Sequence, residues 1–467
     1  MNPGVDSWAE PVEDVYIADV LIIGAGGCGL SAALAASDEG VDVVVLEQSK
    51  TPLGTTSMST GLIPAAGTPE QKAQKIKDSP GQFFNDIMAK NKFGADPVIV
   101  ERVCEMSADT VRWLRDEHNI PLTLVDGFTY PGHSARRMYG THNRTGEELM
   151  AALEHAAESA DVMIVTQAVA TDLMIDENQT VKGVRFTRPD GSVEKIGCHA
   201  LVLACCGFAA NEDMIAKFIP ELKNAIPHTH SASQGFATKW GEILNAQIAD
   251  MDSYQGHAGL AAGHGIPILW PSIMEGGIQV NHLGQRFSNE ARGYSEQAAT
   301  VLAQPQQTVW SIFDTRIEKV LSQFNDYRDA QSAGAIVTAN SIAELADTIG
   351  VDGHKLEATF ANVDDAIESG VPDTFGRTFE QGQQLAPPYL AVKVTGAIFH
   401  TQGGLCVDKD ARVLRNDGRP LPNLFAGGGA ARGISGSGAS GYLAGNGLLT
   451  ATTLGRIAGQ QAAACSQ

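Results

Sequence analysis

The pattern of apolar positions near the N-terminus predicts a strand, a helix and a second strand. Residues 18–24, ADVLIIG, form a short continuous apolar run that ends in glycine, which is typical of a buried strand. The next run, GLSAALAASDEG, has the small apolar residues of a packed helix and ends at Gly40. A further apolar run, VDVVVLEQ at 41–48, predicts the next strand, so the three segments form one βαβ unit.

Later parts of the chain alternate between helical and strand-like patterns. Residues 97–118 and 147–159 have helical periodicity. Residues 161–205 alternate short apolar runs with turn signals such as PDG, which predicts a small antiparallel meander that returns to a buried strand at HALVLAC. Near the C-terminus, NLFAGGG predicts a strand, and GNGLLTATTLGRIAGQQAAA predicts a long terminal helix.

The pattern changes between these two regions, where the βαβ character is weaker. It contains an amphipathic stretch at 312–323 and a helix near 341–369, and glycine-rich segments return at 399. We therefore expect an α/β (α+β) fold with a Rossmann-like first domain over 1–254 and 399–467. An inserted second domain is expected over 255–398.

Composition excludes several classes of partner. The chain has 467 residues, 43% of them hydrophobic, which is enough for a large core. Its net charge of −21 opposes binding to nucleic acid and to anionic membrane surfaces. No apolar run approaches the roughly 20 residues of a membrane span, and the acidic N-terminus does not resemble a signal peptide. These features predict a cytoplasmic protein with no nucleic-acid or membrane partner.

The cysteines predict neither a metal site nor disulfides. Seven cysteines are scattered along the chain, and no two of them form a CxxC pair. Zinc, iron–sulfur and haem-attachment sites use such pairs, so we expect reduced thiols and no metal.

The first βαβ unit carries a dinucleotide signature. Gly24, Gly26 and Gly29 follow the G-x-G-x-x-G pattern between the first strand and its helix. Glu47, at the end of the second strand, has the spacing of an acid that holds a ribose hydroxyl. These residues suit NAD and FAD equally well, so the choice depends on the rest of the chain.

Four segments resemble the flavoprotein superfamily of fumarate reductase, succinate dehydrogenase, aspartate oxidase and the ketosteroid dehydrogenases. They are ADVLIIGAGGCGLSAALAA, GLIPAAG, VNHLGQRFSNE and NLFAGGG with the later GYLAGNGLL. The resemblance implies that the first domain binds FAD and that the insertion caps the flavin ring. It predicts the following FAD-binding residues: Gly24, Gly26, Gly27, Gly29, Glu47, Gln48, Thr55, Thr56, Ser57, Gly61, Val169, Gly207, Gly428, Gly445 and Leu448.

The chain departs from this family in two cofactor contacts. An acid usually follows the last strand to hold the ribityl chain, and this chain has Gly429 there. Some members attach FAD to a histidine in the segment that matches 54–60, which here holds only glycine, serine, threonine and methionine. We therefore expect noncovalent FAD. Because no haem or iron–sulfur motif is present, the resemblance implies an external electron acceptor, for example a quinone.

Four positions match the family's substrate residues. DMDSYQGHAG places His257 at the first substrate histidine, and FHTQGG places His400 at the second. Fumarate reductases also use two arginines, one to donate a proton and one to clamp a carboxylate. The matching positions here are Tyr294, after QRFSNE, and Tyr442, in the last glycine-rich loop.

Two tyrosines in place of two arginines predict a different substrate. A guanidinium binds a carboxylate through a charged fork, which a phenol cannot provide. Ketosteroid dehydrogenases resemble this chain at both positions. The resemblance implies that Tyr294 removes the proton next to a ketone and that Tyr442 stabilises the enolate, assisted by backbone N–H groups near Gly445 and Asn446, while flavin N5 takes the hydride.

For several residues the sequence allows either a substrate contact or a purely structural role. His257 and His400 are either pocket or structural histidines. Arg292 and Trp113 are candidate substrate contacts together with Gly445, although pairing with an acid is favoured for Arg292 and a core position for Trp113.

The expected function is that of an FAD-dependent dehydrogenase that desaturates a cyclic ketone next to its carbonyl. The ketone is cyclohexanone-like or a 3-ketosteroid. Two alternatives remain: an enoate reductase of the fumarate or urocanate type, and a flavin-binding protein without catalysis. The sequence does not define the oligomeric state or the preferred direction.

Overall fold

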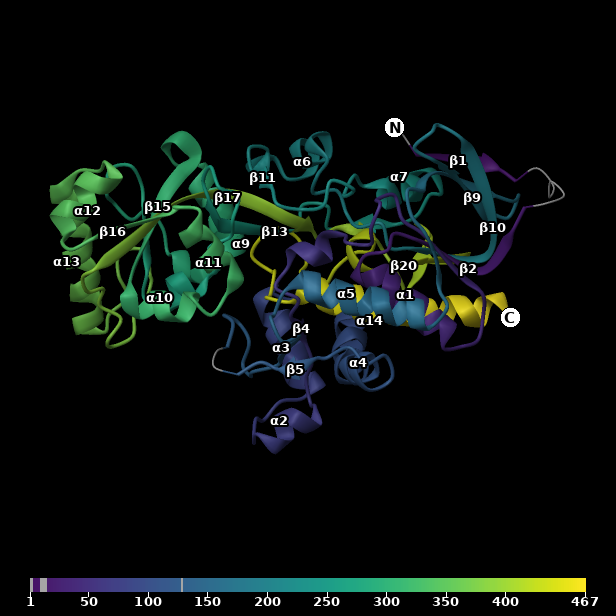
Figure 1. Ribbon diagram of the computed structural model, residues 1–467, viewed down its shortest axis with the longest axis horizontal. Coiled ribbons are helices and arrows are strands. Elements are labelled where there is room, and N and C mark those ends of the chain that lie inside the picture. The colour runs from purple at the N-terminus through teal and green to yellow at the C-terminus, as the bar shows by residue number, and fades with distance from the viewer. Residues whose placement is uncertain (1–2, 9–14, 127–128) are drawn as a thin grey trace. The chain divides into compact units, whose positions relative to one another are not determined.

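The computed structural model describes residues 3–8, 15–126 and 129–467 (Figure 1). The chain divides into two compact units. The first comprises Met1–Ile219, Thr229–Tyr254 and His400–Gln467, and the second comprises Pro220–His228 and Gln255–Phe399. The second unit thus includes Pro220–His228, which the sequence analysis assigned to the first domain.

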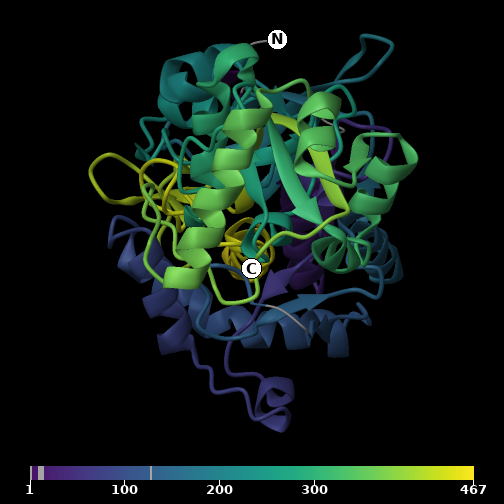
Figure 2. The ribbon, with the colours of Figure 1, turned by 90° about the vertical axis from the view of Figure 1, so that its left-hand side faces the viewer.

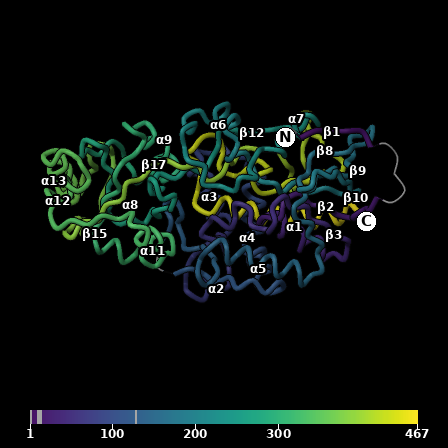
Figure 3. Tube along the Cα trace, turned by 45° about the horizontal axis from the view of Figure 1, so that its top comes forward, coloured from purple at the N-terminus to yellow at the C-terminus, as the bar shows by residue number. Residues whose placement is uncertain are grey.

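The first unit is built on a mixed sheet with the order β1-β8-β9-β10-β2-β3-β7, in which β20 pairs with β10 and with β19. Figure 3 shows β8, β9 and β10 following one another in the same region as β1. The strands are β1 (Gly4–Ser7), β2 (Ile17–Ile23), β3 (Val43–Leu46), β7 (Met163–Val165), β8 (Val169–Ile175), β9 (Val181–Thr187), β10 (Val193–Leu203), β19 (Arg412–Leu414) and β20 (Pro420–Ala426).

Strand β10 joins the two halves of this sheet. Its first residues, Val193–Gly197, pair antiparallel with β9. Its last residues, Leu201–Leu203, pair parallel with β2 on one side and β20 on the other. The carboxyl ends of these parallel strands therefore meet at one edge, where ligands bind in open α/β sheets.

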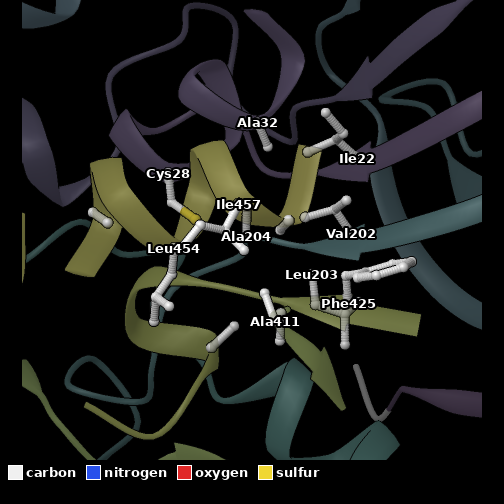
Figure 4. Packing of buried hydrophobic residues seen from close by; sticks show 14 of the residues in the cluster. Ile22, Cys28, Ala32, Val202, Leu203, Ala204, Ala411, Phe425, Leu454 and Ile457 are labelled. Carbon is white, nitrogen blue, oxygen red and sulfur yellow. The ribbon is translucent and has the colours of Figure 1, made fainter. Parts of the chain in front are cut away.

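Two helices, α1 (Gly27–Ser37) and α14 (Asn446–Ser466), pack on each other and on this sheet. All residues of α1 from Gly27 to Ala36 are buried. The helices approach closely because α14 presents glycines: a Cβ on Gly455 would lie 2.5 Å from the carbonyl oxygen of Cys28, and one on Gly459 would meet that of Ala32. Figure 4 shows Cys28 and Ala32 with side chains of α14 and the sheet.

Most of the remaining helices of the first unit begin at polar residues that accept a backbone N–H bond. Thr68, Ser79, Asp96, Thr145 and Asn211 cap five of them. The helices are α2 (Pro69–Ala73), α3 (Pro80–Lys90), α4 (Pro97–Asp116), α5 (Gly146–Ser159), α6 (Glu212–Phe218) and α7 (Phe236–Ile243). Two small sheets complete the unit: β4 (Ile63–Pro64), β6 (Met138–Gly140) and β5 (Thr123–Leu124), and β12 (Ile248–Ala249) with β18 (Gly404–Leu405).

The second unit has its own sheet and its own apolar core (green in Figure 2). Strand β17 is central, since it pairs with β11, β13, β15 and β16, and β15 pairs with β14. The strands are β11 (Ile226–Pro227), β13 (Tyr254–Ala261), β14 (Ile278–Val280), β15 (Thr308–Asp314), β16 (Ile336–Ala339) and β17 (Tyr389–Thr401). The helices are α8 (Pro271–Met274), α9 (Tyr294–Leu302), α10 (Thr315–Leu321), α11 (Asn325–Ser332), α12 (Ile342–Ile349) and α13 (Gly353–Ser369).

The predicted α/β fold class is confirmed, and two element predictions need correction. The expected helix near 341–369 is two helices, because Gly350 adopts a left-handed conformation (φ 69°) and Asp352 starts a new cap. The amphipathic stretch 312–323 is the end of β15 followed by α10. Within the predicted meander, β7 instead pairs parallel with β3 and extends the Rossmann sheet.

In the part of the chain that the structure describes, no helix combines the length and apolar character of a membrane span.

Replacing Gly459 by alanine should destabilise the first unit. The new methyl group meets the backbone of Ala32, which cannot rotate away, so we expect Gly459→Ala to lower the free energy of unfolding by about 3 kcal/mol. Urea unfolding followed by circular dichroism measures this loss.

Gly81→Ala is the matched control for this variant. Gly81 lies in α3, and a Cβ there meets no atom within 4 Å, so alanine should leave stability unchanged or raise it by up to about 1 kcal/mol. Equal losses in the two variants would contradict the close packing of α1 and α14.

Candidate active site

The glycine loop after β2 brings backbone N–H groups to the start of α1. Gly24 has φ 102°, and a Cβ on it would lie 2.6 Å from the carbonyl oxygen of Ala204, so only glycine fits this turn. Gly26 caps α1 without a side-chain hydrogen bond. The N-terminus of α1 therefore presents N–H groups and the positive end of the helix dipole, which suits a pyrophosphate.

Glu47 accepts two backbone hydrogen bonds, one of them from this loop. Its Oε2 accepts from Ala25 N at 2.9 Å, and its Oε1 accepts from Ser49 N at 2.7 Å. The carboxylate is buried, with 6% of the residue exposed. A carboxylate can accept about four hydrogen bonds, so these two contacts leave capacity for a ribose hydroxyl.

Hydroxyl groups of the turn Thr55–Met58 lie beside the glycine loop. Thr56 Oγ1 accepts from Gly27 N at 3.2 Å. Thr55 Oγ1 lies 3.0 Å from Thr229 Oγ1 and 3.4 Å from Ser233 Oγ. The turn thus adds short polar side chains next to the expected position of a phosphate.

A crossing of two glycines explains why no acid stands at position 429. A Cβ on Gly429 would lie 2.8 Å from Gly207 N, and a Cβ on Gly207 would meet Thr401 Oγ1. Thr401 Oγ1 also accepts from Phe208 N at 3.0 Å. Because the two backbones pass so closely, an acidic side chain at position 429 would require them to separate.

The remaining predicted cofactor residues of the first unit are placed as follows. Ser57 Oγ donates to the carbonyl oxygen of Gly54 at 3.0 Å, and Gly61 and Gly428 have positive φ angles. Gln48 is exposed. Val169 begins β8 directly after Ala168, whose N–H donates to the carbonyl oxygen of Glu47. Leu448 is half-buried in the first turn of α14.

Tyr442 lies at the N-terminus of α14. Gly445, with φ 86°, caps this helix, and Gly447 N donates to Tyr442 Oη at 3.4 Å. Burial is the main cause that raises the pKa of Tyr442 above its ordinary value. The phenol therefore stays protonated at neutral pH and can act as a hydrogen-bond donor.

His400 is held beside this helix start by a chain of uncharged groups. Its Nδ1 lies 2.9 Å from Thr401 O, and Gln402 Nε2 lies 2.9 Å from His400 Nε2 and 3.2 Å from Nδ1. Gln402 Oε1 accepts from Ser435 Oγ at 2.9 Å, and Ser435 Oγ accepts from Asn446 Nδ2 at 3.1 Å. Burial lowers the pKa of His400, so the imidazole is neutral.

These features fit FAD. Asn446 is fully buried, and its Oδ1 has no hydrogen-bond partner among the described residues, which leaves an acceptor for a ligand N–H. The start of α1 and the carboxylate of Glu47 match the anionic and ribose parts of a dinucleotide.

In the second unit, a buried ion-pair network fixes the segment before Tyr294. Arg286 donates to both Glu290 oxygens, at 3.0 and 2.7 Å, and also pairs with Asp373. Glu290 Oε1 further accepts from Gln279 N at 3.1 Å. Tyr294 then begins α9 and is half-buried.

Aromatic rings surround Tyr294 within the second unit. The ring of His257 lies 5.3 Å from that of Tyr294 and stacks on Phe399 at 4.9 Å. Trp270 contacts Tyr294 edge to face at 6.2 Å. Burial lowers the pKa of His257 to about 3, and His257 Nδ1 accepts from Gly259 N at 3.1 Å, so the neutral ring carries its proton on Nε2.

One predicted substrate residue, Trp113, lies elsewhere, and Arg292 lies two residues before Tyr294. Trp113 is in the core of the first unit, where its Nε1 donates to Asp38 at 2.8 Å and its ring contacts Arg456. Asp38 follows the C-terminal end of α1, opposite the glycine loop, so we do not propose a substrate contact for Trp113. Arg292 is exposed in the turn Glu290–Arg292.

Several residues near Tyr442 were not predicted. Tyr130 contributes by charge repulsion to the raised pKa of Tyr442, and burial raises the pKa of Tyr130 itself to about 12. Gln402 lies within the quoted segment FHTQGG, and His133 contacts the carbonyl of Ala444 at 2.9 Å. A tyrosine and a histidine in the stretch TYPGHSARR were the available signal.

Comparison with known proteins gives consistent results. A sequence model described as "FAD binding domain" matches residues 19–448. The chain is 30% identical over 451 residues to a protein named fumarate reductase (cytochrome) from Shewanella frigidimarina, covering 96% of this chain and 77% of the relative.

Two solved structures are also similar. One is the open conformation of a flavocytochrome c3 fumarate reductase, with a TM-score of 0.81 and 27% identity, covering 97% of this chain and 79% of that one. The other is 3-ketosteroid-Δ4-(5α)-dehydrogenase from Rhodococcus jostii RHA1 in complex with 4-androstene-3,17-dione, with a TM-score of 0.77 and 25% identity, covering 99% and 100%. With the family match, these similarities identify FAD as the cofactor.

Replacing Glu47 by glutamine should weaken FAD binding. An ionised acceptor contributes about 1.5–3 kcal/mol through its hydrogen bonds, so we expect the Kd for FAD to rise roughly 10- to 100-fold. Titration of the apoprotein with FAD, followed by flavin fluorescence, measures the change. Glu39→Gln replaces an exposed acid of the same unit and should leave the Kd unchanged; unaltered affinity in Glu47→Gln would exclude the proposed ribose contact.

His257 should make the second unit less stable at acidic pH. The unfolded side chain takes up a proton below about pH 6.5, whereas the folded one does so only near pH 3. Between these values the unfolded state binds more protons, so stability falls as pH falls, by about 2 kcal/mol between pH 7 and pH 5. His257→Phe should remove this share of the loss in urea unfolding at the two pH values.

The fully exposed His354 of the same unit provides the control. His354→Phe should retain the wild-type difference between pH 7 and pH 5. An undiminished difference in His257→Phe would show that His257 is protonated in the folded protein.

Proposed function

The chain belongs to the FAD binding domain family, and on that premise we propose that it desaturates a cyclic ketone next to its carbonyl. It is an FAD-dependent oxidoreductase of the fumarate reductase family. The proposed substrate is a cyclohexanone-like ring or a 3-ketosteroid, and the proposed electron acceptor is external and quinone-like. We also propose that FAD is bound noncovalently, because the segment 54–60 holds no histidine.

The observation that carries this proposal is the environment of Tyr442. The resemblance expects a carboxylate-clamping arginine at this position, and the chain instead places a buried phenol at a helix N-terminus. A neutral phenol and adjacent backbone N–H groups can stabilise the negative charge that develops on a ketone oxygen. They cannot neutralise a carboxylate as a guanidinium does.

The two histidines support the same substrate class. Burial lowers the pKa of both His257 and His400, so both imidazoles are neutral at physiological pH. A neutral imidazole can donate a hydrogen bond to a carbonyl or line an apolar pocket. It adds no positive charge for a dicarboxylate.

The proposed reaction removes a proton and a hydride from neighbouring carbons. Tyr294, reacting as its phenolate, takes the proton from Cα and becomes a neutral phenol. The electrons of that C–H bond form an enolate whose oxygen accepts hydrogen bonds from Tyr442 and the start of α14. Bound FAD supplies the two-electron acceptor that receives the Cβ hydrogen as hydride. The C=C bond then forms as the enolate returns to a ketone, so the charges balance.

A second candidate is an enoate reductase of the fumarate or urocanate type. It is favoured by the relative named fumarate reductase, which is 30% identical to this chain. Arg292 would then contact the carboxylate. This alternative predicts that reduced dye is oxidised by an unsaturated acid and that Arg292→Ala abolishes the activity.

Tyr294→Phe should slow flavin reduction by the best ketone at least about 100-fold, because it removes the proposed base. The purified FAD-loaded protein is mixed anaerobically with small cyclic ketones and 3-ketosteroids, and flavin absorbance reports reduction. Fumarate and urocanate are tested with dye-reduced protein.

Tyr327→Phe is the control, since Tyr327 is a buried tyrosine of the same unit that hydrogen-bonds Glu318 at 3.2 Å. It should reduce its flavin within about threefold of the wild-type rate. A Tyr294→Phe rate equal to that of wild type would exclude Tyr294 as the base. If no ketone bleaches the flavin, the result would favour the enoate reductase or a flavin-binding role without catalysis.

A further inference from the structure

We propose that His133 is a positioning residue that holds the loop Gly441–Gly445 so that Tyr442 meets the start of α14. His133 lies in the first unit and is buried. Its Nε2 lies 2.9 Å from the carbonyl oxygen of Ala444, and its Nδ1 lies 3.1 Å from Arg137 Nη1. The importance of Tyr442 rests on the proposed function, whereas the contact between His133 and the loop does not.

The two partners of His133 define its protonation. A carbonyl oxygen only accepts hydrogen bonds, so Nε2 must carry the proton towards Ala444. A guanidinium only donates, so Nδ1 must accept from Arg137. Burial, and then the charge of Arg137, lower the pKa of His133 to about 4, which agrees with a neutral ring bonded on both sides.

Arg137 is itself immobilised, which makes it a rigid anchor. It donates to both oxygens of Asp78 at 2.9 Å and to Asp86 Oδ2 at 2.6 Å. Phe83 lies against the guanidinium at 4.5 Å, and only 1% of Arg137 is exposed. A bidentate buried pair of this kind has little freedom to move, so the position of His133 is defined as well.

The Ala444 carbonyl is a sensitive point of the loop. The carbonyls on either side of it, those of Leu443 and Gly445, accept from backbone N–H groups of α14. The Ala444 carbonyl accepts instead from His133, and this bond orients the peptide that leads into the left-handed Gly445. Since that peptide starts the helix, His133 determines how the first N–H groups of α14 face Tyr442.

Two conservative variants separate the two bonds of His133. His133→Gln can place its amide nitrogen near the position of Nε2 and keep the bond to Ala444. His133→Asn is shorter, so it can keep an acceptor for Arg137 but cannot reach the loop. His118→Asn is the matched control, because His118 is a buried side chain of the same unit that contacts Asp38 at 3.2 Å.

The first measurement is amide hydrogen exchange of the peptide 438–448 in the FAD-loaded full chain. Loss of one hydrogen bond to a buried carbonyl should make this peptide exchange roughly tenfold faster in His133→Asn, whereas His133→Gln and His118→Asn should stay within about threefold of wild type. The second measurement is the rate of anaerobic flavin bleaching at a saturating concentration of the best ketone. We expect this rate to fall in His133→Asn and to stay near the wild-type rate in His133→Gln and His118→Asn.

Each outcome separates the inference from the proposed function. The inference is overturned if the peptide exchanges no faster in His133→Asn than in wild type, or if it exchanges as fast in His133→Gln as in His133→Asn. Either result overturns it even if ketones bleach the flavin. If exchange responds as expected but no ketone bleaches the wild-type flavin, the positioning role of His133 stands and the proposed function fails.

Discussion

The first unit depends on backbone packed directly against backbone at the ends of its central parallel strands. Glycines make this approach possible: Gly455 and Gly459 let α14 touch α1, and Gly207 crosses Gly429 where a side chain would not fit. At the starts of these helices, Gly27 N bonds Thr56 Oγ1 and Gly447 N bonds Tyr442 Oη, and we expect other N–H groups there to face the cofactor. The packing that stabilises the unit therefore also places the groups that are expected to bind the cofactor.

Burial gives three of the predicted site residues, Tyr442, His257 and His400, a common property, namely that they are uncharged. The pKa of Tyr442 is raised, and the pKa values of His257 and His400 are lowered, mainly by removal from water. Charged groups in such surroundings need an ion-pair partner, as Arg137 has in Asp78. Neutral donors need only an acceptor such as a carbonyl oxygen, and this supports the proposal of a ketone as the substrate.

The sequence predicted the parts of the fold that follow from local pattern. The first βαβ unit and the terminal helix each show an unbroken apolar pattern in the sequence. The glycine spacing between a strand and a helix is typical of a dinucleotide-binding turn. The break at Gly350 and the pairing of β7 with β3 depend on conformation and on long-range contacts, which periodicity does not contain. The hydrogen-bond chain behind His400 was missed for the same reason: the fold alone brings Ser435 to Gln402 and Asn446 to Ser435.

The two phenols of the proposed mechanism require opposite protonation states, and their surroundings differ in burial. Tyr442 is 6% exposed and receives a backbone N–H bond, and its burial disfavours the charged form, so it suits a donor. Tyr294 is half-buried, is the first residue of α9, and lies beside the rings of His257 and Trp270. Environments that push two like groups towards different charges are how acid and base roles are divided between them. The burial of Tyr442 supports its proposed role as the donor to the enolate oxygen, and the proposed role of Tyr294 as the base rests on the resemblance to ketosteroid dehydrogenases.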